Sequence, residues 1–170
     1  MARDPEQPQS VQEAIQQTQP FRSRRHEAMI GLLLTAQELM RPMQELLAEH
    51  DGLTHQQYNV LRILRGSKDI GLPTLEIAER MIERTPGVTR LIDRLEKKGL
   101  VRRERSSQDR RQVFCHLTQA GDELLARLDG PVDALDDVLL RGLDDQEVQT
   151  LIATLDRLRH DARTRGPVPQ

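Results

Sequence analysis

One stretch of the chain departs from helical spacing of apolar residues, and it begins just after Gly99. Residues 100–105 and 112–117 have the pattern of two short strands, and the polar loop 106–111 between them completes a small hairpin. On both sides of this hairpin, apolar residues recur at steps of three and four, which is the spacing of amphipathic helices. The sequence therefore predicts a mostly α protein with a minimal sheet set between helices.

Composition agrees with helices and bears on where the protein is found. Aromatic residues are enriched in strands, and this chain has only Phe21, Tyr58 and Phe114. No apolar run reaches the roughly 18 residues of a membrane-spanning helix, and the N-terminus lacks the apolar core of a secretory signal. Cys115 is the single cysteine, so no disulfide can form within the chain. We expect a cytoplasmic protein with no membrane partner.

The net charge of −2 conceals two segments of opposite charge. Residues 80–111 hold eleven Lys or Arg against five Asp or Glu, whereas residues 118–163 hold five against eleven. A basic block can be no more than a solvated face. A short basic segment in an otherwise acidic protein also suits a molecule that presents one face to a polyanion.

Local signals divide the rest of the chain. Residues 1–9 are predicted to be a disordered tail, and residues 164–170 a loose one. A long helix is expected over residues 23–49, with a kink at Pro42. Its apolar residues cover more than one face, so a second surface must cover it, most simply a partner subunit. Residues that typically cap helices begin the helical runs at Ser10, Thr54, Thr74, Thr85, Thr118 and Asp144.

A helix over residues 85–98 would have two unlike faces. Its apolar stripe, at positions i, i+3, i+4 and i+7, consists of Val88, Leu91, Ile92 and Leu95. The other side carries Arg90, Asp93 and Lys97, flanked by Thr89 and Arg94. With the short helix before it and a connection over residues 82–84, this segment forms a helix-turn-helix, which lays its second helix in the major groove of DNA. An ordinary surface helix with salt bridges is the alternative interpretation.

The loop of the hairpin is polar and rich in arginine. Such a tip can enter a minor groove, where the negative potential attracts guanidinium groups. Asp109 stands two residues before Arg111 and can orient its planar head. A solvated turn is the alternative, and the position directly after a helix-turn-helix makes it the less favoured one.

Two stretches of the chain together resemble the MarR family, the multiple-antibiotic-resistance regulators of bacteria and archaea. They are LTHQQYNVLRIL (53–64) and IAERMIERTPGVTRLIDRLEKKGLVRRERSSQDRRQVFCHLTQAG (77–121). The D-x-R pattern at Asp109 and Arg111, followed by Leu117-Thr118 and Gly121, is similar to the wing signature of that family. The resemblance covers about residues 22–163.

The resemblance implies a winged helix-turn-helix with an α-helical dimerisation region formed by the N- and C-terminal helices. On this basis, residues 10–52 and 118–163 would form the dimerisation helices, and residues 53–117 the DNA-binding region. The protein would be a homodimeric transcription regulator and no enzyme. Each recognition helix would read one half of a palindromic operator in double-stranded DNA, with half-sites about one helical turn apart.

The resemblance also implies which residues contact DNA. Arg90 matches the family's recognition-helix arginine, and Arg111 matches the wing arginine that Asp109 orients. Small residues at the start of the recognition helix can meet phosphate through hydroxyls and backbone N–H groups. The expected DNA-binding residues are Arg84, Thr85, Gly87, Thr89, Arg90, Arg94, Asp109, Arg110 and Arg111.

The sequence says less about what controls such a regulator. The resemblance favours release by a small amphipathic or phenolic effector, whose ligand residues stay unknown. Repression is favoured over activation, because a dimer on a promoter palindrome most simply blocks polymerase. Cys115 is expected to be a buried structural thiol. The five histidines show no metal-binding spacing, so neither metal nor cofactor is expected. The alternative function is a winged-helix module that binds protein and has no operator specificity.

Overall fold

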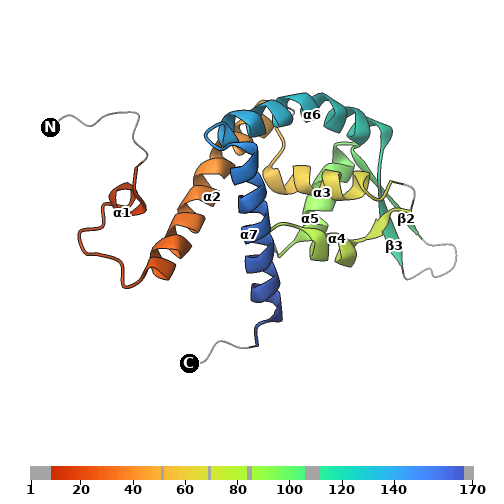
Figure 1. Ribbon diagram of the computed structural model, residues 1–170. Coiled ribbons are helices and arrows are strands. Elements are labelled where there is room, and N and C mark those ends of the chain that lie inside the picture. Colours follow the sequence, from red (N-terminus) through yellow and green to blue (C-terminus); the bar gives the residue numbers. More distant parts are fainter. Residues whose placement is uncertain (1–8, 51, 69, 84–85, 106–111, 167–170) are drawn as a thin grey trace. The chain divides into compact units, whose positions relative to one another are not determined.

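The computed structural model describes residues 9–50, 52–68, 70–83, 86–105 and 112–166 (Figure 1). The chain divides into two compact units, residues 1–128 and residues 129–170. In chain order, the elements are α1 (Val11–Ala14), α2 (Arg24–Glu49), α3 (His55–Arg65), β1 (Leu72–Pro73), α4 (Thr74–Arg80), α5 (Val88–Lys97), β2 (Val101–Arg105), β3 (Val113–Leu117), α6 (Gln119–Leu140) and α7 (Asp145–Thr164). The expectation of a mostly α protein with a minimal sheet is confirmed. The tail over residues 1–8 and the loop over residues 106–111 lie outside the described residues.

Capping boxes begin three helices. Ser10, Thr54 and Asp144 each accept a hydrogen bond from the backbone N–H three residues later, and the Glu or Gln at that position accepts one from the N–H of the cap. Each box satisfies two N–H groups that no helical carbonyl can reach. Thr118 also acts as a cap, because its hydroxyl accepts from the N–H of Gly121 at 3.1 Å at the start of α6. These helix starts were therefore predictable from short sequence motifs.

The starts of α4 and α5 differ from expectation. α5 begins at Val88 rather than at residue 85. Gly87, the residue before it, has a φ of 105°, which is left-handed and cannot be part of a right-handed helix. The connection from α4 consequently runs from Met81 to Gly87, not over residues 82–84. Thr74 is the first residue within α4 and not its cap. Its hydroxyl lies 3.9 Å from the Cys115 sulfur across the sheet.

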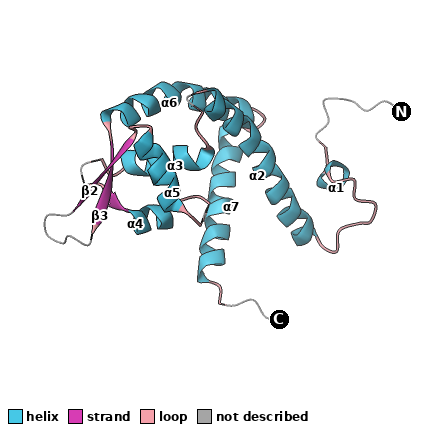
Figure 2. Cartoon of the chain, turned by 180° about the vertical axis from the view of Figure 1, so that it is seen from behind, coloured by secondary structure: helices cyan, strands magenta, loops and turns pink. Residues whose placement is uncertain are grey.

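The predicted hairpin is present and has a third strand beside it. β2 and β3 pair antiparallel, with Val101 opposite Leu117 and Arg105 opposite Val113. β1 pairs antiparallel with the other edge of β3, which gives the order β1-β3-β2 (Figure 2). A strand of two residues that includes a proline has no detectable alternation, so the sequence did not reveal β1.

The core of the first unit holds the whole predicted stripe of α5. Val88, Leu91, Ile92 and Leu95 are all buried. They share the core with residues of α3 and of the start of α6, among them Val60, Leu61, Leu64, Leu124, Leu125 and Leu128. Burying an aliphatic side chain of this size contributes about 1.5–3 kcal/mol. The stripe therefore fixes which side of α5 faces outward.

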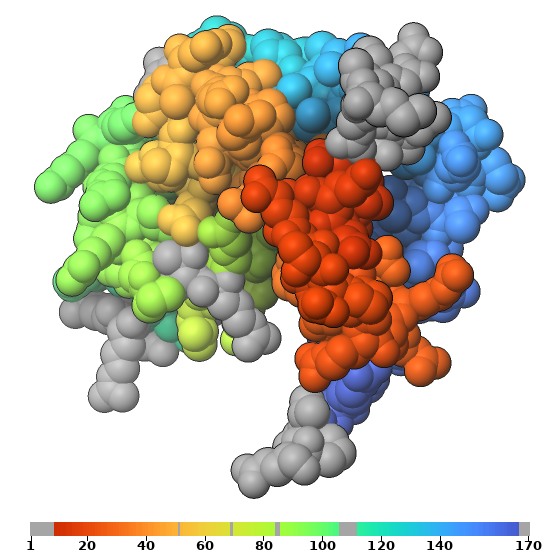
Figure 3. All heavy atoms as spheres, turned by 90° about the vertical axis from the view of Figure 1, so that its left-hand side faces the viewer, coloured from red at the N-terminus to blue at the C-terminus, as the bar shows by residue number. Residues whose placement is uncertain are grey.

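Two long helices leave apolar side chains uncovered in the single chain. α1 packs against α2 (Figure 3). A Cβ at Gly31 would lie 3.0 Å from Val11 Cγ2. The only buried residue in α2 is Leu47, whereas Met29 and Leu33 are 55% and 61% exposed. α7 has no buried residue at all. In the described part of the chain, no helix is both long and apolar enough to span a membrane.

Candidate nucleic-acid interface

The outward side of α5 presents cationic side chains. Arg90, Arg94 and Lys97 are exposed, and so is Thr89 in the first turn of the helix. Within the described residues, neither Arg90 nor Arg94 is engaged by another side chain. Guanidinium and ammonium groups in this state can bind phosphate or the acceptor edges of guanine.

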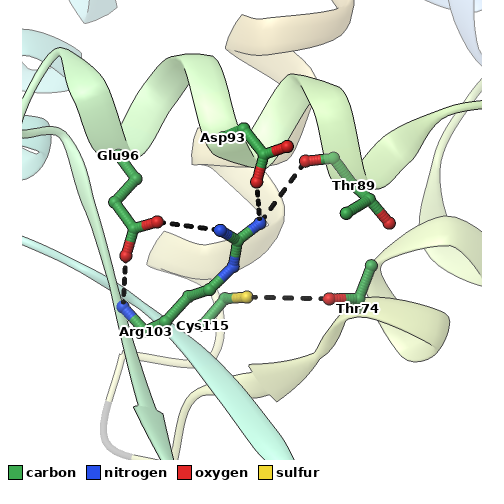
Figure 4. Close-up of polar contacts among 6 residues, drawn as sticks. All are labelled: Thr74, Thr89, Asp93, Glu96, Arg103 and Cys115. Carbon is green, nitrogen blue, oxygen red and sulfur yellow. Dashed lines mark hydrogen bonds and ion pairs between the residues drawn. The ribbon is translucent and has the colours of Figure 1, made fainter.

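Asp93 does not belong to this outward set, although the helical pattern placed it with Arg90 and Lys97. Its Oδ1 lies 2.6 Å from Nη2 of Arg103, a residue of β2 (Figure 4). Glu96, one turn further along α5, binds Nη1 of Arg103 at 2.8 Å. The side of α5 that faces the hairpin is therefore acidic, and the side away from it is basic.

The strand β2 has three arginines in different situations. Arg102 pairs with Glu104 on the surface. Arg103 is turned toward α5, where partial burial works to lower its pKa but the hydrogen bond to Asp93 and the charges of Glu96 and Asp93 outweigh burial and raise it. Arg105, the last residue of the strand, is exposed. Sequence reasoning missed the role of Arg103, because the contact joins a strand to a helix and follows no short spacing rule.

Only some of the residues that are expected to contact DNA belong to the described part of the chain. Gly87, Thr89, Arg90 and Arg94 are described, and all four are exposed. The other five, namely Arg84, Thr85, Asp109, Arg110 and Arg111, lie outside the described residues. The first two belong to the connection before α5, and the last three to the tip between β2 and β3.

The single thiol is not placed to act as a nucleophile. Cys115 lies on the central strand of the sheet and is completely buried. Burial raises the pKa of this thiol, while the hydroxyl of Thr74 and the charge of Arg103 oppose that rise. A neutral and inaccessible thiol is a poor nucleophile, as the sequence predicted. Among the described residues, no group of three His, Cys, Asp or Glu side chains is placed to hold a metal ion.

A pocket of about 310 Å³ lies between α2, α3 and the connection after α4. Its lining is Gln44, Ala48, Leu53, Thr54, His55, Gln56 and Glu83. The Gln56 amide donates to the Glu83 carboxylate at 2.9 Å. Burial lowers the pKa of His55, and the nearby charge of Glu83 opposes this only in part. The pocket is thus lined by hydrogen-bonding groups together with the apolar side chains of Ala48 and Leu53.

Comparison with known proteins identifies the family. The model of the MarR family matches residues 53–113. The HTH-type transcriptional regulator FarR of Neisseria gonorrhoeae is 31% identical over 126 residues, which cover 72% of this chain and 84% of that protein. This chain belongs to the MarR family.

Solved structures of MarR proteins share this architecture. The MarR transcription factor from Planctomyces limnophilus has a TM-score of 0.62 and 38% identity, over 81% of this chain and 98% of that one. A mutant of E. coli MarR complexed with operator DNA has a TM-score of 0.68 and 27% identity, over 75% of this chain and 89% of that one. Helices around a small three-stranded antiparallel sheet are thus the MarR winged-helix fold, and the chain is a transcriptional regulator of this family and not an enzyme.

Proposed function

We propose that the protein represses transcription by binding a palindromic operator in double-stranded DNA as a homodimer. The observation that carries this proposal is the two-sided α5. Four buried apolar residues anchor the helix, and Arg90, Arg94 and Lys97 are exposed on the other side. Such a helix can lie in a major groove with its cations toward bases and phosphates.

Arg90 is proposed to contact a base or phosphate, and Arg94 a phosphate. Thr89 and Gly87 stand at the start of α5, where backbone N–H groups and small side chains favour an anion. The E. coli MarR mutant crystallised with operator DNA supports a DNA-binding role for this fold. A protein that binds the chromosome acts in the cytoplasm of a bacterial or archaeal cell, which agrees with its single buried cysteine.

The wing is proposed to extend the contact into the minor groove. Arg105 is exposed at the end of β2 and leads directly into the tip. Asp109 is proposed to orient Arg111 in the groove, while Arg110 and Arg84 contact phosphates and Thr85 assists at the start of the recognition segment. Insertion of arginine into a narrow minor groove reads shape more than base identity.

Dimerisation is proposed to cover the apolar side chains that a single chain leaves exposed. In the first unit these lie on α2, with Met29, Leu32 and Leu33. In the second unit they lie on α7, with Leu151, Ile152 and Leu158. Exposed apolar residues at helical spacing on long helices are typical of helix-mediated dimers. Residues 10–52 and 118–163 are accordingly proposed as the dimerisation regions and residues 53–117 as the DNA-binding region.

Release from DNA is proposed to follow the binding of a small amphipathic or phenolic molecule. The pocket beside His55 and Glu83 is one candidate location, since it lies next to the connection that leads into α5. A ligand that prefers a conformation unfit for DNA would shift the population away from the bound state.

The test is selection of bound duplexes from fragmented genomic DNA by the full chain, followed by fluorescence anisotropy of the enriched sequence. We expect enrichment of a palindrome and a steep loss of affinity as salt rises, because each neutralised phosphate contributes a log–log slope of about −0.9. Failure to enrich any duplex, with no affinity at low salt, would leave the protein-binding module as the better description.

A further inference from the structure

Arg103 joins the wing to α5 through four hydrogen bonds from one residue. Its guanidinium reaches Asp93 at 2.6 Å, Glu96 at 2.8 Å and the carbonyl oxygen of Thr89 at 3.4 Å. Its backbone N–H donates to the second oxygen of Glu96 at 3.2 Å (Figure 4). The three partners lie along one side of α5, because positions three and four apart share a helix face. One side chain of β2 therefore spans more than a full turn of this helix.

This arrangement differs from the other ion pairs near it. The Arg103 side chain is 24% exposed, whereas Arg102 and Glu104, which pair on the same strand, are 54% and 58% exposed. Exposed pairs contribute little because water screens them. A planar guanidinium held by two carboxylates in a partly buried place is directional, and lysine cannot reproduce its fork of donors. Arg103 can thus fix the orientation of α5 relative to β2 as well as the distance between them.

We propose that Arg103 is a positioning residue for DNA recognition: it sets the orientation of α5 relative to the wing strand β2 and so contributes to sequence specificity without contacting DNA. The inference rests on the proposed function. Base recognition in the major groove and insertion of the wing in the minor groove require the two elements to dock together. A small rotation of α5 would keep phosphate contacts that tolerate displacement and would lose base contacts that do not.

Charge separates this role from a phosphate contact. Two carboxylates more than balance the guanidinium of Arg103, so the cluster attracts no phosphate. The variant Glu96→Gln removes a negative charge, and electrostatics alone would then predict tighter binding to every duplex. If Arg103 orients α5, the same variant lowers the preference for the operator over an unrelated duplex.

The test compares Arg103→Ala, Arg103→Lys and Glu96→Gln with wild type. The matched control is Arg102→Ala, which removes the same charge from the neighbouring position of the strand. Anisotropy with the selected operator and with a scrambled duplex gives the specificity ratio at each salt concentration. We expect this ratio to fall about tenfold in Arg103→Ala and Glu96→Gln. Affinity for the scrambled duplex should stay within about twofold of wild type, since phosphate contacts persist.

A second readout needs no DNA. Cys115 faces Arg103 across the β2–β3 pair and is fully buried, so its reaction with a thiol reagent reports loosening of the packing around the sheet next to Arg103. We expect faster reaction in Arg103→Ala than in Arg102→Ala, with Arg103→Lys between them. Glu96→Gln retains the ion pair of Arg103 with Asp93 but removes the second carboxylate that fixes the orientation of the guanidinium, and it serves if Arg103→Ala does not fold.

Three results would overturn the inference. An unchanged specificity ratio in Glu96→Gln and Arg103→Lys would show no positioning role. An equal loss on both duplexes, with a shallower salt slope, would make Arg103 a phosphate contact. An equal fall of the specificity ratio in Arg102→Ala would show that the effect comes from the loss of one positive charge and not from the position of Arg103. If wild type itself prefers no duplex, the proposed function fails, whereas the thiol reaction still measures how far Arg103 holds the packing around the sheet together.

Discussion

Gly121 lies against the backbone carbonyl of Leu100 so closely that a Cβ at Gly121 would stand 2.4 Å from that oxygen. The same Cβ would lie 2.7 Å from Leu117 Cδ1. The Leu100 carbonyl also accepts from the N–H of Thr118 at 3.1 Å, just before α6 begins. The first turn of α6 is therefore pressed against the segment that leads from α5 into the wing, and only glycine fits there.

Replacement of Gly121 should destabilise the fold. Gly121→Ala is expected to lower the free energy of unfolding by about 1–3 kcal/mol, because the backbone oxygen that it meets cannot turn away as a side chain could. Gly130→Ala in the same helix is the control, since no atom lies within 4 Å of its Cβ position. That change should be neutral or stabilising by up to about 1 kcal/mol. Urea denaturation followed by circular dichroism measures both, and equal midpoints for the two variants would contradict the packing described.

Gly87 is needed for its backbone conformation and not for space. Its φ is 105°, and nothing lies within 4 Å of a Cβ built there. We expect Gly87→Ala to cost about 1–2 kcal/mol of stability through the left-handed backbone alone. Gly142→Ala, whose Cβ position is equally open, should lack that cost. Thermal unfolding of the two variants provides the comparison, and a Gly87→Ala protein as stable as Gly142→Ala would show that the helix start is not constrained by φ.

The burial of His55 predicts a loss of stability in mild acid. Its pKa is lowered from the ordinary value of 6.5, because burial disfavours the charged imidazole. The unfolded chain thus binds more protons than the folded one once the pH drops below about 6.5, and the free energy of unfolding decreases there. His55→Gln removes this component. Melting temperatures between pH 7 and pH 5 should fall less in the variant than in wild type, and parallel curves would rule out the assigned role of His55.

The uncovered residues of α7 predict a dimer that one charge can break. Ile152 is 55% exposed and belongs to the apolar spacing of that helix. Ile152→Asp should convert a dimer to a monomer in size-exclusion chromatography with light scattering, because a buried carboxylate costs several kcal/mol. Gln149→Asp, an exposed polar position on α7, adds the same charge and should stay dimeric. A wild-type protein that elutes as a monomer at micromolar concentration would contradict the homodimer.

The features that could be predicted from the sequence are those that depend on residues close to one another along the chain. Capping boxes such as Thr54 with Gln57 occupy four residues, and the stripe from Val88 to Leu95 occupies eight. The hairpin follows from alternation on both sides of a polar loop. In each case the physical cause is local, since it depends on hydrogen bonds within a turn or on one face of one element.

The features that were missed depend on contacts between elements or on a single backbone angle. β1 exists because Leu72 and Pro73 pair with the edge of β3 that β2 leaves free. A segment of two residues is too short to show a sequence pattern that would predict this pairing. Asp93 was assigned to the outward side of α5 by helical geometry, but an arginine ten residues later holds it. The start of α5 moved by three residues because Gly87 takes a positive φ that spacing alone does not indicate.

The proposed function depends above all on contact between DNA and Arg90 on the exposed side of α5. The most direct measurement is the anisotropy of a labelled operator duplex titrated with wild type and with Arg90→Ala over a range of salt concentrations. Arg163→Ala, an exposed arginine at the end of α7, controls for net charge. The proposed contact predicts that Arg90→Ala loses about 1–3 kcal/mol of binding free energy, while Arg163→Ala binds like wild type. Operator affinity and salt slope that are the same in all three proteins would contradict it.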